Sequence, residues 1–128
     1  MSLKVSPELM EQAQAGKVSD DAFIGCIQTS LPYAWGMVER LVGQLRQTDS
    51  VSAQNTEVPP DDESWGQMFR MMSSDSMRNA IQRHFGVKLA FQNCCKAAVF
   101  KSGASEAYER FISPEAQLLN QDPALLNC

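Results

Sequence analysis

The residue types that could carry out acid–base or nucleophilic chemistry are few in this chain and form no recognisable set. His84 is the single histidine. It lies at the end of a predicted helix, where a favourable interaction with the helix dipole explains it without catalysis. Pairing of His84 with Cys94 or Cys95 would supply a base and a nucleophile, but no third residue that orients them can be named. We therefore predict no catalytic residue.

The spacing of cysteines and glycines predicts neither a metal nor a cofactor. Cys94 and Cys95 are adjacent, whereas zinc sites use C-x2-C pairs. The seven glycines are scattered rather than gathered in a phosphate-binding loop. We expect Cys26, Cys94, Cys95 and Cys128 to be buried thiols of an intracellular chain. A thiol-based redox sensor at Cys94 and Cys95 is the alternative.

Composition predicts a single domain, residues 1–128, in the cytoplasm. Hydrophobic residues make up 44% of the chain and charged residues 20%, as in globular proteins. The net charge of −4, with no basic run, disfavours nucleic acid, because binding phosphates needs clustered Lys and Arg. No stretch approaches the roughly 18 apolar residues of a membrane span. The first residues also lack the apolar core of a secretion signal.

Short helices must position the aromatic side chains, and the strongest runs from Ser30 to Leu45. Ser30 is expected to cap it and Pro32 to occupy its first turn, and one face is apolar. Similar signals predict helices near residues 6–16, 19–29, 61–72, 74–86, 105–112 and 113–119, and a last turn at 122–126. The first helix is short and polar, so we expect it to rest on a larger element.

Two segments differ from this helical pattern. Residues 48–60 are rich in Ser, Thr, Asn and Asp, which predicts a flexible loop. Residues 87–100 fit both a strand alternation and a helix face, so a hairpin turning near Gln92 and a helix both stay open. The predicted fold class is mainly α: a compact bundle of short helices, with or without a small β-hairpin around residues 87–100. We expect it to form a helical homodimer.

Aromatic and methionine side chains are the candidates for binding. Trp65, Met68, Phe69 and Met72 recur at i, i+3, i+4 and i+7. This pattern is typical of a core face or of an adaptable binding surface, since thioethers repack around varied ligands. The candidate peptide-binding residues are Tyr33, Trp35, Trp65, Met68, Phe69, Met72, His84 and Phe91.

Three stretches carry a resemblance to a known family: SLPYAW at residues 30–35, the Pro59–Pro60 break, and RHFGVKLAFQNC at residues 83–94. Together they resemble small actinobacterial helical proteins of lanthipeptide gene clusters of the duramycin and cinnamycin type. The resemblance implies a homodimer that binds a dehydrated precursor peptide. It also implies addition of a peptide lysine amine to a dehydroalanine, which forms lysinoalanine in antibiotic biosynthesis. A hydroxylated aspartate of the substrate would supply the base.

Two functions follow from these observations. The first is the peptide maturase that the resemblance implies, an enzyme that acts by holding its substrate in a reactive shape. The alternative is a non-catalytic helical dimer that serves as a protein or peptide interaction module.

Overall fold

The structure, a computed structural model, describes residues 2–119. The predicted turn at 122–126 and Cys128 lie outside the described residues. Seven helices and three strands occur between residues 2 and 119. In chain order they are α1 (Pro7–Gln14), α2 (Asp20–Ser30), α3 (Pro32–Gln47), β1 (Ser52–Gln54), α4 (Asp62–Met72), α5 (Asp75–Phe85), β2 (Val87–Phe91), β3 (Ala97–Lys101), α6 (Ser105–Phe111) and α7 (Pro114–Leu119).

The mainly helical fold class and the small hairpin are confirmed. β2 and β3 pair antiparallel, with Leu89 opposite Val99, so residues 87–91 and 97–101 are strands rather than a helix. The Asn93 Oδ1 atom stabilises the connecting turn by accepting from the backbone N–H groups of Cys95 and Lys96, at 3.0 and 2.9 Å. Such side-chain acceptance replaces the backbone partners that a helix would have supplied.

The expected loop at residues 48–60 contains a third strand, which is a correction. β1 pairs antiparallel with β3 and gives the order β1-β3-β2. Asn55, only 2% exposed, anchors the following residues. Its Nδ2 atom donates to the Cys95 carbonyl at 2.6 Å, and its Oδ1 atom accepts from Arg40 at 3.0 Å. These long-range contacts hold a polar segment that composition alone marks as flexible.

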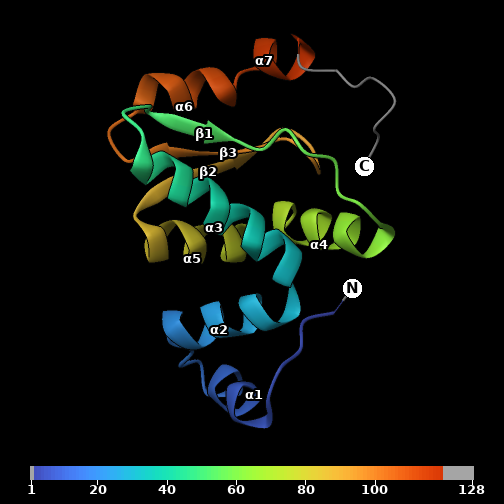
Figure 1. Ribbon diagram of the computed structural model, residues 1–128. Helices are drawn as coiled ribbons and strands as arrows, with labels where there is room; N and C mark the ends of the chain where they lie inside the picture. The colour runs from blue at the N-terminus through green and yellow to red at the C-terminus, as the bar shows by residue number, and fades with distance from the viewer. Residues whose placement is uncertain (1, 120–128) are drawn as a thin grey trace.

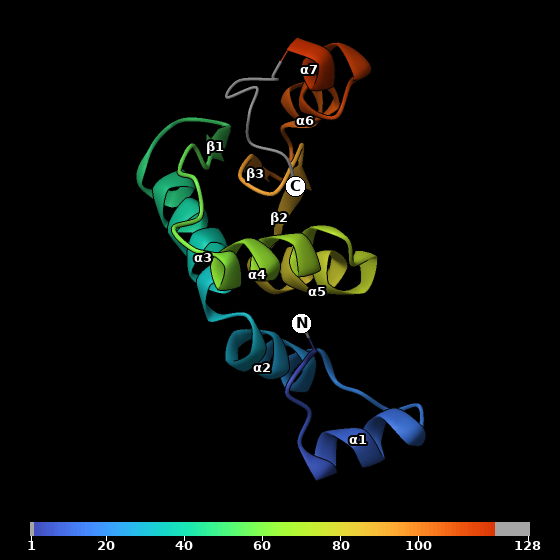
Figure 2. The same cartoon turned by 90° about the vertical axis from the view of Figure 1, so that its right-hand side faces the viewer.

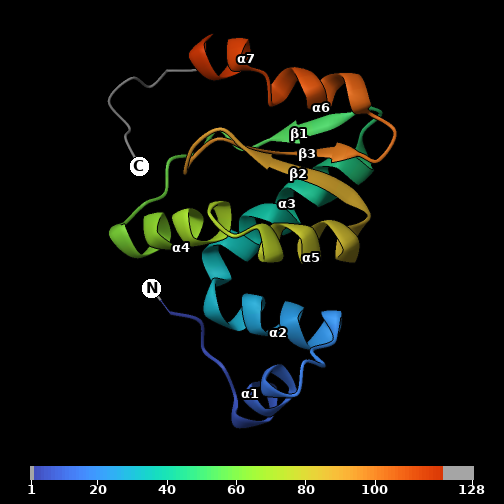
Figure 3. The ribbon, with the colours of Figure 1, turned by 180° about the vertical axis from the view of Figure 1, so that it is seen from behind.

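The sheet separates two hydrophobic cores. Helices α3, α4 and α5 lie on one side of it, and α6 and α7 lie on the other (Figures 1 and 3). The larger core joins α2, α3, α4 and α5 to Leu89, Ala97 and Val99, whereas Ala98 and Phe100 face Phe111 of α6. The alternating directions of strand side chains explain this division.

The start of α3 differs from the sequence prediction. Ser30 ends α2 and does not cap α3; its hydroxyl accepts from the Lys4 backbone N–H at 2.7 Å. The cap comes instead from Gln67 of α4. Its Oε1 atom accepts from the backbone N–H groups of Tyr33, at 2.6 Å, and Ala34, at 3.2 Å. A side chain distant in sequence therefore satisfies the free amides of this helix.

The described cysteines include both free thiols and a disulfide-bonded residue. Cys26 and Cys95 are buried free thiols, in line with expectation, whereas Cys94 is disulfide-bonded, which corrects the prediction of a thiol there. Among residues 2–119, no helix is both long and apolar enough to cross a membrane.

Candidate functional site

The eight residues predicted to bind peptide do not form one surface. Trp35 and Met68 are buried in the larger core. Tyr33, Trp65, Met72 and Phe91 are partly buried against it. Phe69 is 51% exposed, and His84 is also exposed. The periodic pattern on α4 identified an amphipathic helix, but a core face and a binding face share that pattern. Peptide contact at these residues stays a prediction.

Trp35 and His84 are the candidate pair that the structure clearly brings together. Their ring centroids lie 5.6 Å apart, and His84 also contacts Phe85 edge-on at 4.7 Å. The Cys95 thiol donates to Asn93 Oδ1 at 3.2 Å, so its hydrogen-bond partner is an amide and not the imidazole. Aromatic contacts explain where His84 lies, and no nucleophile–base pair is seen among the contacts of residues 2–119.

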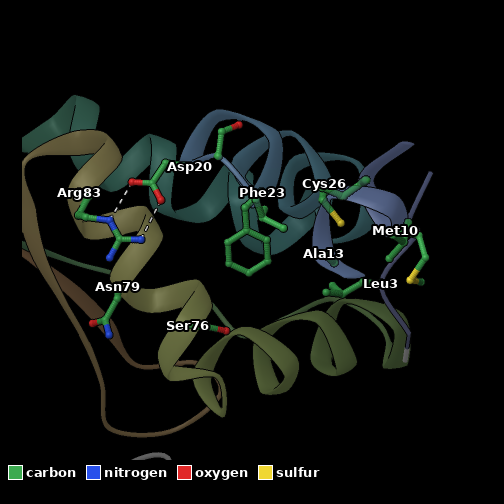
Figure 4. A pocket seen from close by; sticks show the side chains of 13 residues that line it. Leu3, Met10, Ala13, Asp20, Phe23, Cys26, Ser76, Asn79 and Arg83 are labelled. Carbon is green, nitrogen blue, oxygen red and sulfur yellow. Dashed lines mark hydrogen bonds and ion pairs between the residues drawn. The ribbon is translucent and has the colours of Figure 1, made fainter. Parts of the chain in front are cut away.

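A hollow lies elsewhere, between the N-terminal segment, α1, α2 and α5. We call it the α1 groove. Its volume is about 570 Å³, and Figure 4 shows the side chains that these elements contribute to its lining. Ser19, Asp20, Ser76, Asn79 and Arg83 provide its polar edge. Its apolar lining consists of Leu3, Val5, Leu9, Met10, Ala13, Val18, Phe23 and Cys26.

Helix α1 is locally well specified. The Ser6 hydroxyl accepts from the Leu9 backbone N–H at 3.1 Å, Pro7 occupies the first turn, and Glu8 lies near the positive end of the helix dipole. Gly16 follows with φ of +71°, a conformation that glycine adopts at little cost. These signals explain why a helix of only eight residues forms here.

Helix α1 packs only weakly against the rest of the protein, although the residues within it specify a helix well. None of the eight residues of α1 is buried, although we expected this helix to rest on a larger element. Figures 1 and 2 show α1 standing at the far end of the molecule, beyond α2. A second hollow of about 350 Å³ also separates it from α2. Leu9 and Cys26 line both hollows, so α1 is set off from the body of the protein.

Two contacts at Lys4 hold the segment that leads into α1. The backbone N–H of Lys4 donates to the Ser30 hydroxyl, and its carbonyl accepts from the Cys26 thiol at 3.3 Å. The chain is fixed again where α2 begins, at Asp20. Residues 5–19 thus form a helical flap attached at both ends, and the groove lies beneath it.

The two charged side chains that line the groove neutralise each other. Arg83 Nε and Nη2 donate to the two carboxylate oxygens of Asp20, at 2.8 and 2.9 Å. Hydrogen bonding from Arg83 lowers the pKa of Asp20, and the same contact raises the pKa of Arg83. The groove therefore offers an apolar lining with a paired charge at its edge, which suits an uncharged apolar group.

The sequence does not reveal this site, because its apolar residues come from four separate segments. Leu9, Met10 and Ala13 belong to the first helix, and Phe23 and Cys26 belong to the second. The long-range contacts of Lys4 with Ser30 and Cys26 help to set these two sides beside one another. No group of three or more possible metal ligands occurs in the described part of the chain.

The described residues form a small helical domain with a three-stranded sheet and an apolar groove. A family model described as NucS shadow ORF matches residues 1–128, so the chain belongs to that family. The description names a reading frame and gives no reaction, substrate or partner. No curated protein and no solved structure matches the chain.

This family membership corrects the resemblance drawn from the sequence. The match over the whole chain is to the NucS shadow ORF family and not to a lanthipeptide maturase family. The assignment to lanthipeptide and antibiotic biosynthesis is therefore wrong. SLPYAW and RHFGVKLAFQNC misled because they contain a helix start, a helix end and a strand, which many folds share.

Proposed function

We propose that this protein is a non-catalytic interaction module whose α1 groove binds the apolar face of a helical polypeptide segment. The observation that carries the proposal is the groove itself. Its volume of about 570 Å³ lies within the roughly 300–1,000 Å³ of typical ligand sites. Lysinoalanine formation rested on the resemblance alone and is not part of the proposal.

The chemistry of the lining favours a polypeptide over a charged small molecule. Asp20 and Arg83 bind each other, so a ligand with a charged group would have to displace an existing partner. An amphipathic helix needs only apolar contact, through side chains at i, i+3, i+4 and i+7. Met10 and Leu9 add flexible side chains that can adapt to such a ligand.

The exposure of three apolar lining residues supports the same conclusion. Val5, Met10 and Val18 are 41%, 46% and 42% exposed, and all three line the groove. Apolar side chains that gather at the edge of a hollow mark an interaction surface more often than isolated ones do. A bound helix would remove them from water.

Titration with a synthetic peptide tests the proposal. The probe is a neutral, end-capped helical peptide with leucines at i, i+3, i+4 and i+7 and a fluorophore at one end. A scrambled peptide of the same composition is its control. We expect saturable binding of the helical probe only. Equal binding of both peptides, or of neither, contradicts the proposal.

A matched pair of variants locates the binding. Val18 in the groove and Val58 outside it are 42% and 43% exposed, so a charge at either position should be tolerated by the fold. Val18→Glu is expected to weaken probe binding about tenfold or more, because a charge enters an apolar contact. Val58→Glu should leave binding unchanged. Equal effects of the two substitutions would place binding elsewhere.

A further inference from the structure

Within the helical flap, residues 5–18 are held to the rest of the described protein by no hydrogen bond and no ion pair. The hydrogen bonds that they make lie inside the segment, from the Ser6 cap of α1 to the amides of Gly16 and Lys17 at its end. Leu9 is half-buried, and every other residue from 5 to 18 is exposed. Polar contacts therefore define α1 as a helix but do not attach it to the body of the protein.

The apolar packing of α1 is also sparse. Leu3 before the flap and Phe23 after it pack against the larger core, whereas no residue of α1 does. Leu9 and Cys26 line both the α1 groove and the second hollow of about 350 Å³, so open space borders the side of α1 that carries Leu9. Because burial of apolar surface is the main force that holds an element in place, α1 is held chiefly through the two ends of the flap.

The two ends of the flap allow α1 to move as a unit. At one end, Lys4 is held by Ser30 and Cys26. At the other end, Gly16 follows α1 with φ of +71°, and α2 begins at Asp20. Helix α1 has eight residues, and isolated helices shorter than about 12 residues are marginal in water. Departure of α1 from α2 and loss of its helical structure should therefore be one event.

We propose that the helical flap opens as one unit in the free protein and closes over a ligand in the α1 groove. The inference rests on the proposed function and adds control of access to that site. The flap contributes Val5, Met10 and Val18 to the lining, and a bound apolar helix would cover these side chains. The ligand thereby supplies apolar contacts that α1 lacks in the free protein, and it shifts the equilibrium towards the closed flap.

Amide hydrogen exchange of the full chain, resolved by residue, tests the inference. In the free protein, the amides of α1 should exchange at least about 100-fold faster than those of Ile24 and Ile27 in α2, because local opening costs less than global unfolding. Free helical probe at about ten times its Kd should slow exchange in α1 about tenfold, because it binds and stabilises the closed flap.

Two matched glycine substitutions test the Gly16 end of the flap. Space is open at the Cβ positions of Gly16 and Gly103, but of these two only Gly16 has a positive φ. Other L-residues are disfavoured in that conformation, so Gly16→Ala should increase the open population, and with it the exchange rate of α1, about 5–30-fold. Gly103→Ala should leave exchange in α1 unchanged. Circular dichroism checks that both variants fold.

The outcomes separate the inference from the proposed function. Amides of α1 that exchange as slowly as the amide of Ile27 overturn the inference. Acceleration that Gly16→Ala confines to the last turn of α1, near Ala15, shows fraying of the helix end and also overturns it. Probe binding that leaves exchange in α1 unchanged overturns the inference and leaves the proposed function intact. A protein that never binds the probe refutes the proposed function, whereas fast exchange of free α1 still supports opening of the flap.

Discussion

Replacement of Gln67 with leucine should lower the free energy of unfolding more than the same replacement of a glutamine on the surface. Gln67 is 4% exposed, and its Oε1 atom is the acceptor for two backbone N–H groups at the start of α3. No side chain of the preceding residues caps that helix. Leucine fills similar space but accepts no hydrogen bond, so Gln67→Leu isolates the loss of the cap.

The size of the effect follows from where the two amides lie. Ala34 is fully buried and Tyr33 is partly buried, so water cannot fully replace the lost acceptor. An unsatisfied buried donor costs about 1–3 kcal/mol, and burial of the leucine offsets part of the combined cost. We expect Gln67→Leu to lower the free energy of unfolding by about 2–3 kcal/mol. This corresponds to a decrease in Tm of about 8–12 °C.

Urea denaturation followed by tryptophan fluorescence measures this change. Trp35 lies beside the capped amides of α3, and Trp65 lies on α4, the helix that carries Gln67. Tryptophan fluorescence therefore reports on both helices that this hydrogen bonding joins. Gln44→Leu is the matched control, because Gln44 is an exposed residue of α3; its effect should stay within about 0.5 kcal/mol. A loss at Gln67 no larger than the loss at Gln44 would refute the argument that a distant side chain caps α3.

Two further predictions concern the ion pair and the backbone. Since Arg83 lowers the pKa of Asp20, this pair should stabilise the fold above the ordinary aspartate pKa and stop doing so as the pH falls through the lowered value. Asp20→Asn should therefore reduce stability slightly in urea titrations at neutral pH and not in strong acid; an equal effect at both pH values contradicts this. Gly86 has φ of +67° with nothing near its Cβ position, so Gly86→Ala should destabilise by about 1–2 kcal/mol through backbone strain alone. Gly43, inside α3 and equally open, should gain about 0.5–1 kcal/mol on Gly43→Ala, and thermal melts that rank the two variants in the opposite order would contradict both.

Local chemistry explains which parts of the fold were predictable. The caps at Ser6, Ser19 and Ser74 each accept a backbone N–H three residues along the chain, so residues within one turn determine them. Gly86 follows α5 in the left-handed conformation, which is typical of glycine at the end of a helix. Helix ends were therefore largely accessible from the sequence.

Long-range contacts explain what was not predictable. Ser30 has the right type for a cap, but its hydroxyl serves Lys4, and Gln67 takes over the role from another helix. The candidate residues on α4 formed a genuine stripe, yet Met68 faces the core and only Phe69 is well exposed. The groove depends on where α1 lies relative to α2, and no pattern within either helix encodes that position.

The central claim, that the α1 groove binds an apolar helix, is tested most directly at its own cysteine. Cys26 lines the groove and Cys95 lies in the hairpin turn, and both are free thiols with 7% exposure. Alkylation of each thiol would be followed by mass spectrometry in dilute protein, with and without the helical probe. We expect the probe to slow alkylation of Cys26 and to leave the alkylation rate of Cys95 unchanged. Unchanged rates at Cys26 while the probe is bound, or equal slowing at both thiols, would contradict it.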